Sequence, residues 1–214
     1  MSESGTEAYE GRTGLPPRVE EAVRLARSLG FEYSCLPEHG ELLRLLARGF
    51  GGAVTGGAVI GETGTGCGVG LAWLLAGAHV QSRIVSVERD PERAAAAQKL
   101  FADAPGVTVL HGDWRALRAF APFDLLVLDG GGQGKGDEPP LDPTEWMPTG
   151  GVLVIDDFSP LTSWPPMHGG VVDTARTYWL DHPQLRATQV NVRSDAATII
   201  ATYVGEDTAS RLGP

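Results

Sequence analysis

The chain has 214 residues, of which 42% are apolar and 21% are charged, an ordinary composition for one globular domain. Its formal net charge of −10 at pH 7 argues against broad binding to nucleic acid, because phosphates would be repelled over most of the surface. No apolar run has the length of about 18 residues that a membrane helix needs. We therefore expect a small-molecule partner, and neither a nucleic acid nor a membrane.

Residues 1–17 are polar and acidic, and they lack the basic and apolar regions of a secretory signal. We expect a disordered N-terminal arm over residues 1–17, a single domain over residues 18–204 and a short C-terminal tail over residues 205–214. The only two cysteines, Cys35 and Cys67, are too few for a disulfide framework. A cytoplasmic location is the expectation that follows.

Helical and strand patterns alternate along the chain from residue 18 onward. Apolar spacing predicts N-terminal helices over residues 18–29 and 40–50 and, within a core of residues 58–204, a first strand over 58–62. Further strands are predicted over 83–88, 107–113, 123–130 and 150–157, with helices over 69–78, 91–101 and 114–120 between them. A helix over 171–180 and strands over 186–192 and 197–204 complete the pattern.

This alternation predicts an α/β fold, a mostly parallel sheet with helices on both faces. The last two strands are joined by residues 193–196 only. That link is too short for a parallel crossover, so we expect these strands to pair antiparallel.

The first predicted strand ends in a glycine-rich turn, E-T-G-T-G-C-G, from Glu62 to Gly68. Gly64, Gly66 and Gly68 allow the backbone to turn sharply and to approach a ligand closely, next to the N-terminus of the following helix. A nucleotide cofactor is therefore expected. The third glycine of the dinucleotide fingerprint is missing, and the Glu62 carboxylate would repel a pyrophosphate. The same carboxylate would suit the ammonium of an amino-acid group.

This turn resembles the first motif of the class I S-adenosylmethionine-dependent methyltransferases. Residues 36–157 resemble the small O-methyltransferases related to the catechol and caffeoyl-CoA enzymes. The resemblance implies a doubly wound, Rossmann-like sheet of seven strands with an antiparallel last strand. It also implies S-adenosylmethionine as cofactor and methyl transfer to an oxygen of a small molecule. The N-terminal helices could support a homodimer.

The resemblance assigns roles to four further residues. Glu88 would bind the ribose hydroxyls of the cofactor, Asp113 would accept from the adenine amino group, and Trp114 would offer its backbone N–H to the ring. Asp129 would lie beside the methyl donor. Three of these residues also have a structural alternative: Glu88 could be a solvated strand end, Asp113 could cap the next helix, and Trp114 could pack at the sheet edge.

The metal-dependent branch of the family holds a divalent cation with residues that correspond to Asp129, Asp156 and Asp157. The last position is Asn in that branch and Asp here. Magnesium or calcium would suit such oxygen ligands. In the alternative interpretation, the three acids have separate roles and no shared ion.

The sequence also offers candidates for the general base and for contacts with the acceptor. Lys135 and His168 are the candidate bases, although both could simply be solvated. Trp146 and Trp164 lie in regions expected to overhang the site, where they would suit an aromatic acceptor, or they could pack at the edge of the core. Two other functions stay open: a nicotinamide-dependent oxidoreductase, and a regulatory protein that binds the cofactor without transfer.

Overall fold

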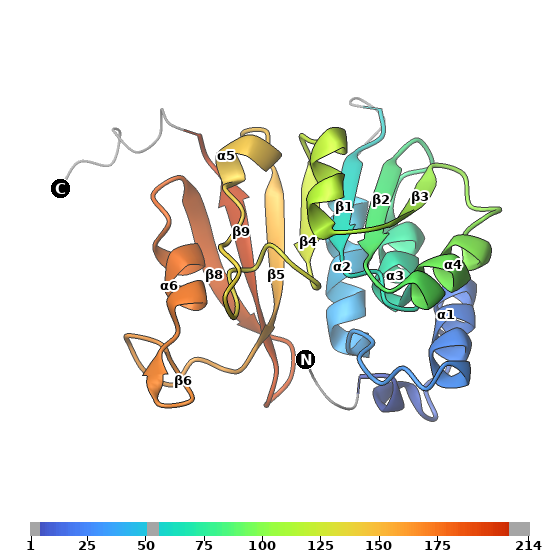
Figure 1. Ribbon diagram of the computed structural model, residues 1–214, viewed down its shortest axis with the longest axis horizontal. Helices are drawn as coiled ribbons and strands as arrows, with labels where there is room; N and C mark the ends of the chain where they lie inside the picture. Colours follow the sequence, from blue (N-terminus) through green and yellow to red (C-terminus); the bar gives the residue numbers. More distant parts are fainter. Residues whose placement is uncertain (1–4, 51–55, 206–214) are drawn as a thin grey trace.

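The computed structural model describes residues 5–50 and 56–205 and contains a seven-stranded sheet in the order β3-β2-β1-β4-β5-β9-β8 (Figure 1). The strands are β1 Val59–Thr63, β2 Arg83–Glu88, β3 Val107–His111, β4 Leu125–Leu128, β5 Val152–Phe158, β8 Leu185–Asn191 and β9 Ala197–Tyr203. Strands β1 to β5 are parallel, whereas β9 is antiparallel to both of its neighbours. The predicted fold class and the antiparallel last strand are confirmed.

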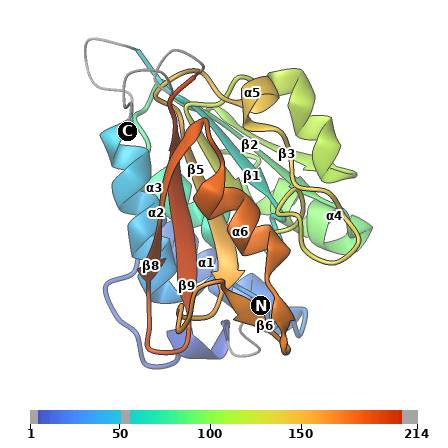
Figure 2. The same ribbon diagram turned by 90° about the vertical axis from the view of Figure 1, so that its left-hand side faces the viewer.

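Helices cover both faces of this sheet, and each face has its own apolar cluster. One face carries α1 Pro17–Ser28, α2 Pro37–Gly49, α3 Val69–Gly77 and α4 Pro91–Leu100. The other carries the 3-10 helix η2 Trp114–Phe120, α5 Pro143–Trp146 and α6 Thr174–Asp181. Figure 2 shows α2 and α6 on opposite sides of strands β8 and β9.

The central strand β4 explains why both faces must be covered. Leu125 and Val127 belong to the first cluster, and Leu126 and Leu128 belong to the second, as the alternation of side chains in a strand requires. All four are buried. A strand that is apolar on both sides is stable only between two layers of helices.

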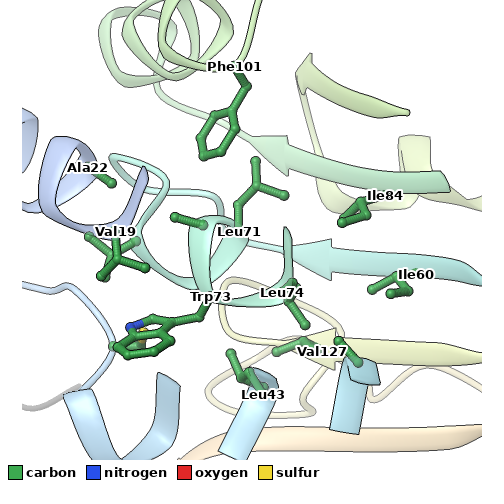
Figure 3. Packing of buried hydrophobic residues seen from close by; sticks show 14 of the residues in the cluster. Val19, Ala22, Leu43, Ile60, Leu71, Trp73, Leu74, Ile84, Phe101 and Val127 are labelled. Atoms are coloured by element: carbon green, nitrogen blue, oxygen red, sulfur yellow. The ribbon is translucent and has the colours of Figure 1, made fainter. Parts of the chain in front are cut away.

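Helix α3 is apolar on nearly all sides because it lies between the sheet and two other helices. Figure 3 shows Leu71 and Leu74 of α3 between strand residues such as Ile84 and the α1 residue Val19. Trp73, also fully buried, is directed toward α2. This packing fixes the N-terminus of α3, and therefore the glycine turn before it.

The N-terminal segment corrects the expectation of a disordered arm. Residues 5–16 pack against the domain through a short 3-10 helix, η1 Glu7–Tyr9, and the side chains of Thr6 and Tyr9 are buried. Composition does not reveal this order, because it depends on polar partners distant in sequence. Residues 1–4 of the expected arm and residues 206–214 of the expected tail lie outside the described residues.

The long connection after β5 contains a small hairpin, β6 Met167–His168 and β7 Val171–Val172, which the sequence analysis did not predict. Helix α5 was also missed because it is only one turn long. Within residues 5–50 and 56–205, no helix combines the length and apolar character needed to cross a bilayer.

The close approach of α2 to α3 gives a test of this packing. A Cβ on Gly40 would collide with the indole of Trp73, whereas a Cβ on Gly49 of the same helix would meet open space. We expect Gly40→Ala to lower the free energy of unfolding by about 1–3 kcal/mol through overpacking. The matched control, Gly49→Ala, should be neutral or should raise it by up to about 1 kcal/mol. Urea unfolding measures both, and equal effects would contradict the proposed contact.

Candidate active site

A cavity of about 670 Å³ opens at the carboxyl ends of the parallel strands, where the strand order reverses between β1 and β4. Both the glycine turn and several of the predicted acids border it. Its border includes Phe31, Cys35, Gly64, Gly66, Gly70, Glu88, Asp113, Trp114, Asp129, Gly131 and Asp157. The fold thus brings together most of the residues that the sequence singled out.

The glycine turn packs tightly against the loop that follows β4. Gly64, Gly66 and Gly68 all have positive φ angles, of 84°, 54° and 89°. A Cβ on Gly64 would lie 2.7 Å from Cα of Gly130, so a side chain there would push the two loops apart. The hydroxyl of Thr63 accepts hydrogen bonds from Asp129 N and Gly130 N, at 3.2 and 3.3 Å, and keeps the loops in register.

Helix α3 begins directly after this turn, and no side chain caps its N-terminus. Its first residues, Val69 and Gly70, border the cavity. The unpaired N–H groups and the positive end of the helix dipole therefore favour a negatively charged ligand group at this point.

Glu62 lies buried beneath the start of α3, against Gly70. Its Oε2 accepts a hydrogen bond of 2.6 Å from Ser86 Oγ. Burial raises its pKa to about 8, although the Ser86 bond lowers it and the charge of Glu88 raises it further. The sequence predicted a carboxylate facing the ligand. In the structure, Gly70 borders the cavity and Glu62 lies behind it.

Glu88, at the end of β2, is fixed to the glycine turn by its carboxylate. Oε2 accepts from Gly66 N at 2.8 Å, and Oε1 accepts from Asp90 N at 2.8 Å and from Arg93 Nη2 at 2.9 Å. A carboxylate has about four acceptor positions, so capacity remains for one ligand hydroxyl without any rearrangement. The Arg93 guanidinium also lies 5.1 Å from the centre of the Phe31 ring.

Asp113 and Trp114 border the cavity beyond β3. Asp113 accepts a hydrogen bond of 2.9 Å from Arg115 N, so it does cap η2. Trp114 Nε1 donates to Glu138 Oε1 at 2.6 Å, and the Arg115 guanidinium covers its ring at 4.6 Å from the centroid. These contacts leave the side chains ordered at the edge of the cavity.

Asp129, Asp156 and Asp157 come together from the ends of β4 and β5. Each offers one carboxylate oxygen, and these oxygens all lie within 4.8 Å of one another. Burial raises the pKa of Asp129 well above its usual range, and the charges of Asp156 and Asp157 raise it further. Burial and the charge of Asp156 also raise the pKa of Asp157, whose backbone has a φ angle of 65°. The cluster is therefore costly to ionise fully without a cation.

His39 pairs with this cluster from α2, and the sequence analysis missed it. Its Nδ1 lies 2.7 Å from Asp156 Oδ2, and its side chain is only 2% exposed. Burial alone would lower the pKa of His39, but the neighbouring Asp156 raises it above the usual value. Conversely, burial would raise the pKa of Asp156, but the charge and hydrogen bond of His39 lower it. No motif connects these two residues, because only the packing of α2 on β5 brings them together.

Lys135 contacts the same part of the site, at the Asp156–Asp157 turn. Its Nζ donates to the backbone carbonyls of Asp156 and Asp157, at 2.6 and 2.7 Å, and lies 4.3 Å from the centre of the Phe158 ring. Burial lowers its pKa, against the opposing effect of the aspartates. The side chain of Lys135 is therefore held beside the acids. Lys135 is not among the described residues that border the cavity.

The remaining candidates lie elsewhere. His168 is exposed on β6, away from the described border of the cavity. Trp146 is buried in the second apolar cluster, and Trp164 is exposed beside a different hollow, so neither overhangs the cavity. Cys67 does border the cavity, but burial raises its pKa to about 11, which keeps it a thiol.

Comparison with known proteins agrees with this geometry. Residues 62–158 match the family model described as "Methyltransferase domain". A protein of Mycobacteroides abscessus that is named as an O-methyltransferase is 35% identical over 101 residues, which are 44% of each chain. Another protein with this name, from Mycobacterium tuberculosis, is 29% identical over 133 residues, which are 56% of this chain and 54% of that one. The chain thus spans about half the length of the curated relatives that it matches.

Solved structures extend the likeness to nearly the whole fold. The O-methyltransferase TomG of Streptomyces achromogenes, solved with S-adenosylmethionine, has a TM-score of 0.68 and 19% identity, with 94% of this chain and 96% of that one covered. An O-methyltransferase of Bacillus cereus, solved with S-adenosylhomocysteine, has a TM-score of 0.67 and 19% identity, with 93% and 96% covered. At such identities the likeness shows the fold.

The glycine turn, the fold and the matched domain all indicate the same class of protein. The chain resembles the class I S-adenosylmethionine-dependent methyltransferases, with residues 62–158 matching the methyltransferase domain and the whole sheet having their fold. The relatives and solved structures that it matches are O-methyltransferases. The resemblance seen in the sequence is confirmed.

The raised pKa of Glu62 leads to a test at the level of stability. A carboxyl group with a folded pKa of about 8 and an ordinary value of 4.5 binds more protons in the folded state between these pH values. The free energy of unfolding of the cofactor-free protein should therefore fall as the pH rises from 4.5 to 8, by up to about 5 kcal/mol from this group. Glu62→Gln removes this pH dependence. The free energy of unfolding of the variant, relative to that of wild type, should therefore increase with pH.

Urea unfolding at pH 5, 6.5 and 8 measures the difference between the two proteins. Glu92→Gln is the control, because Glu92 is exposed at the rim of the same cavity. Its difference from wild type should not change with pH. A constant difference for Glu62→Gln as well would contradict the raised pKa.

Proposed function

We propose that this protein transfers a methyl group from S-adenosylmethionine to an oxygen of a small molecule. One observation carries the proposal: the carboxylate of Glu88 is bonded directly to the glycine turn, with 2.8 Å between Gly66 N and Oε2. A carboxylate that could bind a diol and a loop that lets a ligand approach the backbone thus border one cavity. The match of residues 62–158 to a methyltransferase domain supports the same activity.

Each end of the cofactor has a suitable partner at this cavity. Glu88 would bind the ribose hydroxyls, Asp113 would accept from the adenine amino group, and the backbone N–H of Trp114 would serve the adenine ring. The N-terminus of α3 would attract the carboxylate of the amino-acid group. Glu62 would then balance its ammonium from behind Gly70, directly or through water.

The same features argue against the two alternatives. A pyrophosphate would approach the buried acid Glu62 and would lack the third glycine of the dinucleotide motif. This disfavours a nicotinamide-dependent oxidoreductase. A regulatory protein would need the cofactor pocket but not the buried acids Asp129, Asp156 and Asp157, which carry a large cost in desolvation.

When it is bound, S-adenosylmethionine supplies a methyl group whose bond to sulfur breaks as its bond to the acceptor oxygen forms. Asp129 borders the cavity at the end of β4. It is therefore the carboxylate placed to accept the proton that the acceptor hydroxyl loses, and we assign it this catalytic role. Alignment of acceptor and donor in the cavity would supply much of the acceleration.

The acid cluster also fits a divalent cation, magnesium or calcium. Its three donors are carboxylate oxygens, the type that these ions prefer, and a cation would offset their repulsion. Asp129, Asp156 and Asp157 would hold the ion, which would lower the pKa of an acceptor hydroxyl. His39 and Lys135 would keep the Asp156–Asp157 turn in position for it.

Calorimetry with the purified protein tests the cofactor assignment. We expect binding of S-adenosylmethionine and S-adenosylhomocysteine but not of NADH. Glu88→Gln should weaken S-adenosylhomocysteine by at least about tenfold, since hydrogen bonds to a charged group are worth about 1.5–3 kcal/mol. Glu92→Gln, with the same loss of charge at the rim, should stay within about twofold of wild type. Binding of NADH in place of the methyl donor would overturn the proposal.

Mn²⁺ binding, followed by electron paramagnetic resonance on the complex with S-adenosylhomocysteine, tests the cation site. Asp129→Asn and Asp156→Asn should each weaken Mn²⁺ at least about tenfold, because each removes a charged ligand. Asp103→Asn removes an exposed carboxylate remote from the cluster and should have no effect. Equal affinity in all four proteins would show that the acids do not share an ion.

A further inference from the structure

The segment before α1 reaches the wall of the cavity, although it lies outside the region that matches the methyltransferase domain. We call residues 5–15 the N-terminal strap. The parallel strands point downward in Figure 1, and the strap, in dark blue, lies below them near the lower ends of α1 and α2. It therefore lies at the edge of the sheet where the cavity opens.

Thr6 fastens the strap to the loop between α1 and α2. Its backbone N–H donates to Glu32 O at 3.1 Å, and its hydroxyl donates to Phe31 O at 2.7 Å. The same hydroxyl lies 2.7 Å from Ser34 Oγ. The side chain of Thr6 is only 4% exposed, so these bonds form away from competing water.

Tyr9 makes the second attachment and connects three parts of the protein. Its hydroxyl accepts from Trp73 Nε1 of α3 at 2.9 Å and donates to Cys35 O at 3.0 Å. Burial raises the pKa of Tyr9, so the phenol stays neutral and can donate. The loop is thereby tied to the same helix that begins at the glycine turn.

The loop that the strap holds forms part of the cavity wall. Phe31, Tyr33, Ser34 and Cys35 all border the cavity. The Phe31 ring also packs on the glycine turn: a Cβ on Gly66 would lie 2.9 Å from Cε1 of that ring. The guanidinium of Arg93 also lies over the Phe31 ring, and it is bonded to Glu88.

These contacts form a continuous path from the strap to the acid that would bind the ribose. We propose that the N-terminal strap is a working part of the cofactor site, and that Thr6 and Tyr9 are positioning residues that hold the Phe31–Cys35 wall against the glycine turn. This inference rests on the proposed function. It gives the strap a role in cofactor affinity, although the composition of this segment alone is typical of a disordered arm.

Tyr9→Phe tests the inference with the loss of a single oxygen atom. It leaves Trp73 Nε1 and Cys35 O without their partner, so the wall should loosen. We expect the dissociation constant of S-adenosylhomocysteine to rise about tenfold by calorimetry. Thr6→Val is the second variant and should act in the same direction. Circular dichroism would verify that each variant is folded at the temperature used.

Thiol labelling gives a second measurement that needs no cofactor. Cys35 and Cys67 are both buried, and peptide mapping after iodoacetamide treatment distinguishes them. Tyr9→Phe should speed the labelling of Cys35 by at least about tenfold, because its carbonyl is released from the strap. Tyr203→Phe is the matched control. It also removes a phenolic oxygen, but from β9, and no residue of β9 is among the described residues that border the cavity. It should therefore alter neither measurement.

The two measurements separate the possible failures. If Cys35 labels faster but affinity is unchanged, the strap holds the loop without serving the site, and the inference is overturned. Unchanged labelling together with unchanged affinity also overturns it. If wild type itself does not bind S-adenosylhomocysteine, the proposed function fails, and the inference that depends on it fails too. The labelling rates then still report whether the strap holds the wall.

Discussion

The arrangement of this site depends on one constraint: several carboxylates are buried at the same edge of the sheet. Asp129 and Asp156 face the α2 and α3 side, on which Glu62 also lies, because each shares a strand face with an apolar residue of the first cluster. An ionised carboxylate in such surroundings costs several kcal/mol unless a partner offsets it. The neighbours of these acids follow from this constraint. Ser86 bonds Glu62, His39 bonds Asp156, and Lys135 holds the turn that follows.

The two loops that border the cavity, the glycine turn and the Asp129 loop, are joined and cannot move independently. Thr63 joins them, with its hydroxyl between the backbone of the glycine turn and that of the Asp129 loop. Gly64 and Gly130 touch through backbone atoms alone. A ligand that displaces one loop must therefore displace the other. The glycine turn and the Asp129 loop are consequently held in one register, which suits a reaction that depends on alignment.

The fold and the cofactor motif were readable from the sequence because both are local signals. Strand β4 is apolar on two faces, and the glycines and Glu88 lie next to strand ends, so the parallel topology alone brings them together. His39 and Tyr9 gave no such signal, since each acts through contacts with residues distant in the sequence. Trp146 was misleading for a related reason. Its neighbours in sequence are typical of a loop, but its ring packs on Phe123 inside the second cluster.

Asp157 and Lys135 belong together physically. Asp157 stands where the resemblance to the metal-dependent enzymes led us to expect an asparagine, so the cluster here has one more carboxyl group than that resemblance implies. The structure places the ammonium of Lys135 on the carbonyls of Asp156 and Asp157, where it offsets the charge of that group without occupying a carboxylate position. A glycine-rich loop, residues 130–136, is what lets this lysine return to the turn, because four of its glycines have positive φ angles. Asp157 and the glycine loop that brings Lys135 to its turn are therefore best understood as one feature, in which the lysine offsets part of the charge of the acid cluster.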